Sequence, residues 1–94
     1  MDIVVRTTGA LRADASDGVH QGVMDEPVEA GGAGAGLSPT QTLLAALGGC
    51  TAVTLKMYSA RKGWPLEDVD VRVRLEIPER DAADQTKRFV QEVV

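Results

Sequence analysis

The chain has 94 residues, enough for one small domain with a thin core, and its apolar share of 44% is typical of a globular protein. Fourteen acidic against ten basic residues give a formal charge of −4, which disfavours nucleic acid and anionic membrane surfaces as partners. One cysteine excludes an intramolecular disulfide, and one cysteine with one histidine cannot fill a tetrahedral metal site, so no metal is expected. No cofactor is expected either.

The first part of the chain predicts an antiparallel meander of three short strands. Residues 2–8, 11–15 and 19–24 supply the strands, with a Gly9-Ala10 turn and then a tight Asp17-Gly18 turn between them. The N-terminus lacks the basic and then apolar pattern of a signal peptide, which favours a cytoplasmic location.

Residues 30–36 consist only of alanine and glycine, so we expect a loose connector. Its glycine spacing faintly suggests a phosphate-binding turn. No Gly-Lys-Ser/Thr follows, however, and no strand runs directly into it, so a plain connector is the preferred interpretation.

A helix is predicted over residues 39–62. Ser38 is a suitable cap, Pro39 fits the first helical position, and Gln41 can complete a capping box, while Gly63 is placed to end the helix. Because leucine, valine and methionine side chains point in nearly all directions, the helix is expected to be central and buried.

Two features of this region constrain its packing and its relation to a membrane. The pair Gly48-Gly49 costs helix propensity, which favours close approach of a second helix at that point. Pro39 and the preceding glycines leave an uncharged apolar stretch too short for a bilayer, so no membrane span is expected.

The rest of the chain predicts a β-hairpin. Apolar and charged residues alternate over residues 69–77, Pro78 ends that strand, a polar stretch covers residues 79–87, and residues 88–94 begin a return strand. The fold class is therefore α+β: an antiparallel meander, a long central helix and a hairpin. A chain that stops within a strand is expected to be a single domain over residues 1–94 that is incomplete at its C-terminus.

Cys50 is the one candidate nucleophile that the sequence singles out. A thiol attacks as thiolate, and the helix dipole fades before this position, so a neighbouring cation has to activate it. The alternative is a buried packing cysteine with no chemistry. The candidate cations are Arg6, Arg12, His20, Arg61, Arg72 and Arg74.

Residues 38–66, which carry Ser-Pro-Thr-Gln-Thr before the helix interior and Gly-Gly-Cys-Thr within it, resemble the central helix of the OsmC/Ohr family of osmotically inducible and organic hydroperoxide resistance proteins. Residues 20–27 and the glycine-rich loop resemble the same family's third strand and connector. The resemblance implies an OsmC-like half-domain in an intertwined homodimer. It also implies an oxidative-stress peroxidase that reduces organic hydroperoxides with two cysteines and is regenerated by a dithiol reductant.

The resemblance also assigns site residues. Cys50 matches the reactive cysteine, Arg12 or Arg6 lies where an activating arginine belongs, and Gln41 stands where the family has a glutamate. The second cysteine is absent from this sequence. Two hypotheses therefore stay open: a peroxidase acting through Cys50, Arg12 and Gln41, and a truncated, non-catalytic protein that dimerises or binds a hydrophobic ligand.

Helix geometry adds an expectation about Gln41. Nine residues at 100° each place Gln41 and Cys50 on opposite sides of a straight helix. If Gln41 serves the thiol, we expect it to do so from the other protomer or past a kink at Gly48-Gly49.

Overall fold

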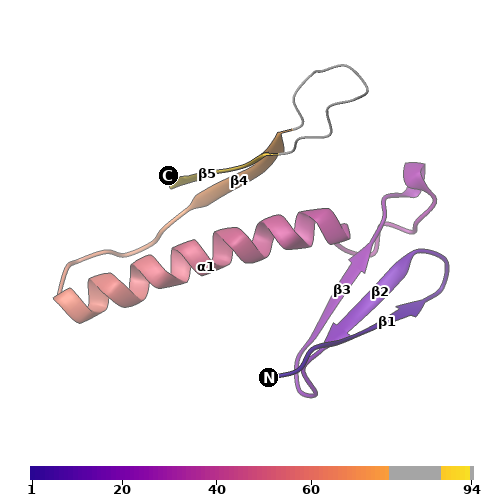
Figure 1. Cartoon of the computed structure of the whole chain (residues 1–94), viewed down its shortest axis with the longest axis horizontal. Coiled ribbons are helices and arrows are strands. Elements are labelled where there is room, and N and C mark those ends of the chain that lie inside the picture. Colours follow the sequence, from indigo (N-terminus) through magenta and orange to yellow (C-terminus); the bar gives the residue numbers. More distant parts are fainter. Residues whose placement is uncertain (77–87, 94) are drawn as a thin grey trace. The chain divides into compact units, whose positions relative to one another are not determined.

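The computed structural model describes residues 1–76 and 88–93. Its contacts divide the chain into an N-terminal unit, Met1–Leu43, and a C-terminal unit, Leu44–Val94, which are described in turn. The element order is a three-stranded sheet, a short 3-10 turn, one long helix and a two-stranded sheet (Figure 1), so the α+β prediction is confirmed.

The N-terminal unit contains the predicted antiparallel meander. Its strands are β1 (Val4–Thr8), β2 (Arg12–Ser16) and β3 (Gln21–Asp25), in that spatial order. At the β2–β3 connection the Asp17 carboxylate accepts backbone N–H bonds from Val19 and His20, at 2.8 and 2.6 Å, and Gly18 takes a positive φ of 101°. The predicted turn is therefore present, and it is held by a side chain.

The glycine-rich loop, residues 31–36, is restrained and not loose, so that expectation is wrong. It follows a single 3-10 turn, Val28–Ala30, and folds back over the end of β3. The Asp25 side chain, only 2% exposed, accepts backbone N–H bonds from Ala33 and Ala35 at 3.3 and 3.2 Å. A Cβ on Gly32 would lie 2.0 Å from the Glu26 carbonyl oxygen, so this close approach needs glycine.

Helix α1 spans Pro39–Lys62, as the sequence predicts. At its start the Ser38 hydroxyl accepts the Gln41 N–H at 3.1 Å, and the Gln41 side-chain oxygen accepts the Ser38 N–H at 2.9 Å. This reciprocal pair is a capping box. The helix ends at Gly63, which has a positive φ of 72°.

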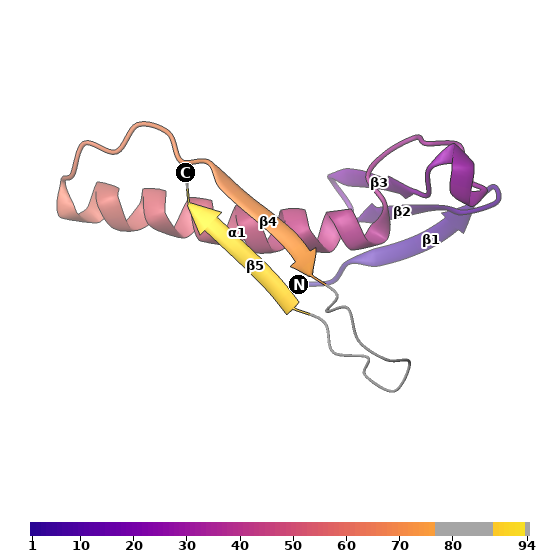
Figure 2. The same cartoon turned by 90° about the horizontal axis from the view of Figure 1, so that it is seen from above.

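The C-terminal unit places a hairpin against α1. Strand β4 (Val71–Glu76) pairs with β5 (Arg88–Val93) in an antiparallel register that joins Val71 to Val93 (Figure 2). A Cβ on Gly48 would lie 3.0 Å from a methyl group of Val73, so it is a strand, and not the expected second helix, that approaches this glycine. Gly49 faces open space. The predictions for residues 77–87, including Pro78, lie outside the described residues.

The helix is not buried on all sides within one chain. Of its residues only Gly48 and Ser59 are buried, and no hydrophobic side chain in the described part of the chain is buried. The prediction of a buried helix is therefore wrong for the single chain, because a two-stranded hairpin is too narrow to surround a helix.

By length and composition alone α1 could cross a membrane, since its most apolar window has a mean hydropathy of 1.3. One such helix is weak evidence, because the core helix of a soluble protein passes the same test.

Candidate functional site

Two different faces of α1 carry apolar residues, and Cys50 lies on the face that the hairpin leaves open. The inner face is defined by Gly48, which contacts β4, and by Thr51, whose hydroxyl reaches Gln91 of β5 at 2.7 Å. The partly or fully buried residues of this face recur at helical spacing. They are Leu44, Leu47, Gly48, Thr51, Ala52, Leu55 and Ser59.

The outer face carries an exposed stripe of small and apolar residues. The stripe consists of Ala46, Cys50, Val53, Met57 and Ala60, all exposed. Their spacings of four, three, four and three residues are those of a helix–helix seam. At 100° per residue they lie about 120–200° around the helix from Gly48, opposite the hairpin. The sequence shows apolar residues all round the helix, and the structure separates them into a covered face and an open one.

Cys50 itself is a free, exposed thiol in the single chain. Within one chain, Cys50 is therefore not a buried packing cysteine. The physical reason is its position two residues from Gly48, which turns it about 200° away from the strand that covers Gly48. Only something that covers the outer stripe can exclude water from this sulfur.

Thr51, the residue after Cys50, ties the helix to the hairpin, and the sequence alone did not reveal this contact. Its hydroxyl lies 3.2 Å from the Leu47 carbonyl oxygen and 2.7 Å from the side-chain oxygen of Gln91. A single hydroxyl proton serves one acceptor, so both contacts are satisfied when the Gln91 amide turns to present its N–H group. The turn of α1 that bears Cys50 is thereby fixed on β5.

Arg12 is already paired within the N-terminal sheet. Its guanidinium donates to the Asp14 carboxylate at 2.9 and 3.5 Å. The hydrogen bond and the charge of Asp14 raise the pKa of Arg12, so the guanidinium stays protonated. Arg12 belongs to the N-terminal unit and Cys50 to the C-terminal unit, and their pairing stays a prediction.

Gln41 serves the helix start. Its side-chain oxygen is engaged by the Ser38 backbone N–H in the capping box. A neutral amide in this position supplies no charge for holding an arginine. The structure therefore gives Gln41 a capping role, and its assignment to the thiol chemistry stays a prediction.

Other candidate cations also have partners. The His20 ring nitrogen Nδ1 lies 3.0 Å from the Asp17 carboxylate. Arg74 binds Glu76 at 2.9 Å and Glu92 at 3.1 Å on the open face of the hairpin. All three pairs are largely exposed, so each contributes little to stability.

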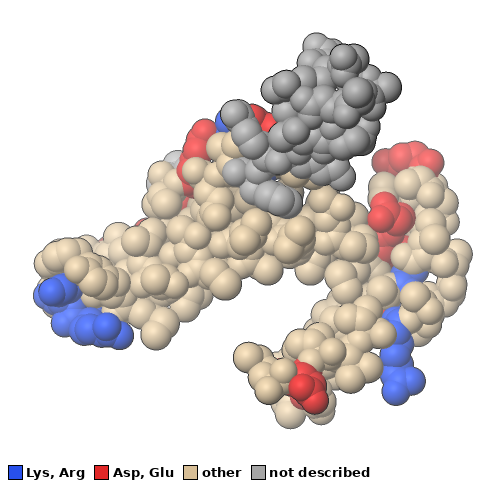
Figure 3. Space-filling model, viewed as in Figure 1, with Lys and Arg blue, Asp and Glu red and all other residues tan. Residues whose placement is uncertain are grey.

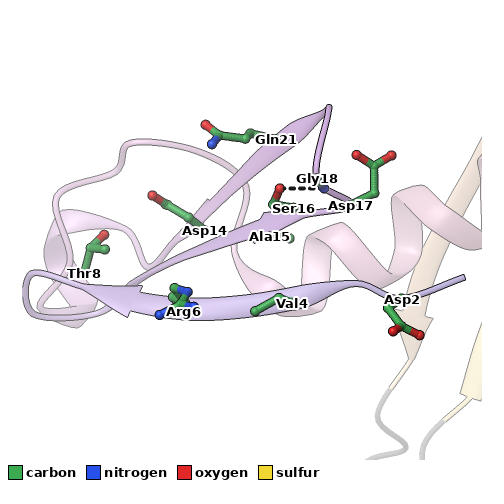
Figure 4. A pocket seen from close by; sticks show the side chains of 10 residues that line it. All are labelled: Asp2, Val4, Arg6, Thr8, Asp14, Ala15, Ser16, Asp17, Gly18 and Gln21. Atoms are coloured by element: carbon green, nitrogen blue, oxygen red, sulfur yellow. Dashed lines mark hydrogen bonds between the residues drawn. The ribbon is translucent and has the colours of Figure 1, made fainter.

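The N-terminal sheet carries a groove of about 510 Å³ on one face (Figure 4). Arg6 and Val4 of β1 lie along one wall, and Asp14 and Gln21 come from the neighbouring strands. The Ser16 hydroxyl in this groove accepts the Gly18 N–H at 3.0 Å. Among the described residues no group of three His, Cys, Asp or Glu side chains is placed to hold a metal ion.

A comparison with known protein families finds a match for the second and larger part of the chain. Residues 31–93, which include the glycine-rich loop, α1 and the hairpin, match the family model described as OsmC-like protein. No curated protein and no solved structure matches the chain.

Proposed function

Because the chain belongs to the OsmC-like family, we propose that it reduces organic hydroperoxides through Cys50, working as a homodimer in the cytoplasm. The observation that carries the proposal is the position of the thiol within the exposed outer stripe of α1. In a single chain the outer stripe and the Cys50 thiol face solvent. When another surface packs on the stripe, the thiol is shielded from water.

A second copy of the chain is the proposed cover. Val53 and Met57 of the stripe are 58% and 59% exposed, and no described hydrophobic side chain is buried within the chain. A chain of this size without a core of its own needs association to be stable. Packing two outer stripes together buries apolar area at about 25 cal/mol per Å² and removes water from around Cys50.

The proposed chemistry is two-electron reduction of the peroxide. The Cys50 thiolate attacks one peroxide oxygen, the O–O bond breaks, and the alcohol leaves with a proton while the sulfur becomes a sulfenic acid. A dithiol reductant then attacks the sulfenic sulfur and water leaves. The second thiol of the reductant opens the mixed disulfide and regenerates Cys50.

The dimer is tested with a matched pair of charge substitutions. Val53→Asp puts a carboxylate into the stripe, whereas Thr54→Asp puts the same charge on the next residue, which is exposed and lies off the stripe. By light scattering, the wild type and Thr54→Asp are expected at twice the chain mass of 9.9 kDa, and Val53→Asp at the chain mass. A monomeric wild-type protein, or equal behaviour of both variants, would contradict the proposed seam.

The catalytic part is tested by steady-state consumption of cumene hydroperoxide with dithiothreitol as reductant. The wild-type protein is expected to consume the hydroperoxide catalytically. The Cys50→Ser variant is expected to be inactive and still dimeric.

Two observations favour a second candidate, a non-catalytic family member that dimerises or binds a hydrophobic ligand. The chain has a single cysteine, and both Arg12 and Gln41 already have partners. A dimer that binds cumyl alcohol but consumes no cumene hydroperoxide would favour this candidate.

A further inference from the structure

The C-terminal end of α1 carries an exposed patch that the proposed chemistry does not use. We call it the aromatic–basic end, and it consists of Tyr58, Arg61, Lys62 and Trp64. The last turn of the helix carries Arg61 and Lys62, and Figure 3 shows basic side chains gathered at this end.

The backbone fixes Trp64 in this patch. The Gly63 N–H donates to the Ala60 carbonyl at 3.2 Å, and the Trp64 N–H donates to the Ser59 carbonyl at 2.8 Å. These two bonds, together with the positive φ of Gly63, form a Schellman motif. These backbone bonds therefore hold Trp64 at the helix terminus, so its indole does not belong to a freely moving segment.

The two aromatic rings contact each other and still face solvent. Their centroids lie 5.5 Å apart at 68°, an edge-to-face arrangement. An apolar contact between these two helix positions commonly accompanies a Schellman motif. Even so, Trp64 is 56% exposed and Tyr58 is 47% exposed. The contact explains where the rings are, but it does not explain why so much ring surface is left uncovered.

The charges beside the rings have no acidic partner among the residues that the structure describes. The Lys62 ammonium lies 5.7 Å from the centre of the Tyr58 ring. Neither Arg61 nor Lys62 forms an ion pair with any residue in the described part of the chain. Two cations that are unpaired within the described ranges therefore stand next to two rings that each have an apolar body and a polar tip.

We propose that the aromatic–basic end docks on an anionic phospholipid surface. Tryptophan and tyrosine are favoured at the membrane–water boundary, and lysine and arginine are attracted to anionic headgroups within a Debye length of the surface. A soluble acidic peptide would pair with the two cations, but it would not account for the exposure of the two aromatic rings. The sequence-based expectation of no membrane partner rested on the net charge of −4 of the whole chain. The aromatic–basic end differs from this average because its two charged side chains are both positive.

The charge count sets the strength of docking. Each cation near a phosphatidylserine-rich surface contributes a preference of about fivefold, so the two together give about 30-fold tighter binding than to a neutral surface. The negative charge on the rest of the chain opposes docking, so the binding is weak and depends on salt. It does not depend on the chemistry of Cys50.

Trp64 is the only tryptophan in the chain, so its emission reports on this patch alone. The protein is titrated with vesicles of phosphatidylcholine and with vesicles of phosphatidylcholine mixed with phosphatidylserine. A blue shift on the anionic vesicles, with about 30-fold weaker binding to the neutral ones, is expected. Added salt should reverse it.

The double variant Arg61→Gln/Lys62→Gln keeps the fluorophore and is expected to lose this preference. The control Arg6→Gln/Arg72→Gln removes the same two charges elsewhere and is expected to keep it. No shift for the folded wild type, equal shifts on both vesicles, equal losses in both variants, or the same shift with soluble polyglutamate would each overturn the proposal.

Discussion

Replacing the two neighbouring glycines of α1 by alanine, one at a time, separates packing from helix propensity. Both substitutions gain the same helix propensity, about 0.5–1 kcal/mol, because both sites lie inside the same helix. They differ in what the new methyl group meets. At Gly48 it would lie 3.0 Å from a methyl group of Val73, whereas at Gly49 nothing lies within 4 Å.

The expected sizes follow from these distances. Carbon atoms pack best at about 3.5–4.0 Å, and a valine in a strand is stiff, so β4 has to move away from the methyl group added at Gly48. Overpacking of this kind costs about 1–3 kcal/mol, which exceeds the propensity gain. Gly48→Ala is therefore expected to lower the free energy of unfolding by about 0–2.5 kcal/mol, and Gly49→Ala to raise it by about 0.5–1 kcal/mol.

Urea unfolding at one fixed protein concentration measures both values, because association makes apparent stability depend on concentration. The double variant Gly48→Ala/Val73→Ala removes the crowding methyl group and should recover part of the loss, beyond the sum of the single effects. If Gly48→Ala proves as stable as Gly49→Ala, the close contact between α1 and β4 is refuted.

Three further substitutions and one pH titration test local features of the fold. Asp25→Ala removes the acceptor for two N–H groups of the glycine-rich loop and should cost about 1–3 kcal/mol in urea unfolding, whereas an unchanged stability would contradict the account of that loop. The backbone N–H of His20 is the main cause that lowers the pKa of Asp17 from 3.8 to about 2, so stability from this turn is present above pH 4 and is lost as the pH falls towards 2. Carboxyl NMR titration of Asp17 measures this directly, and a midpoint near 4 would refute it. Ser38→Ala should cost about 1 kcal/mol and Gln41→Glu should be nearly neutral in thermal unfolding, because glutamate preserves the capping box; equal losses would argue against the box.

The ends of α1 are predictable from sequence because their causes are local. Ser38, Gln41 and Gly63 act within a few residues of the helix termini, and the structure places all three in the predicted roles. The strands of the meander are predictable for the same reason, with bounds shifted by one or two residues.

Burial is not predictable in this way, because it depends on which face of an element a distant segment covers. Nothing near Gly48 in the sequence indicates that Val73 contacts it and that Cys50 is left exposed. The same holds for Asp25, which binds loop N–H groups eight and ten residues further on. The candidate nucleophile was found from the sequence, but its surroundings required the fold.

The reaction of Cys50 with an equal amount of cumene hydroperoxide, followed in time by intact mass and by the loss of free thiol, tests the proposed function most directly. A Cys50 thiolate stabilised by a neighbouring cation at the seam of a dimer should be consumed far faster than free cysteine at neutral pH, with one oxygen atom gained per chain before reductant is added. Consumption no faster than that of free cysteine would contradict the proposed peroxidase.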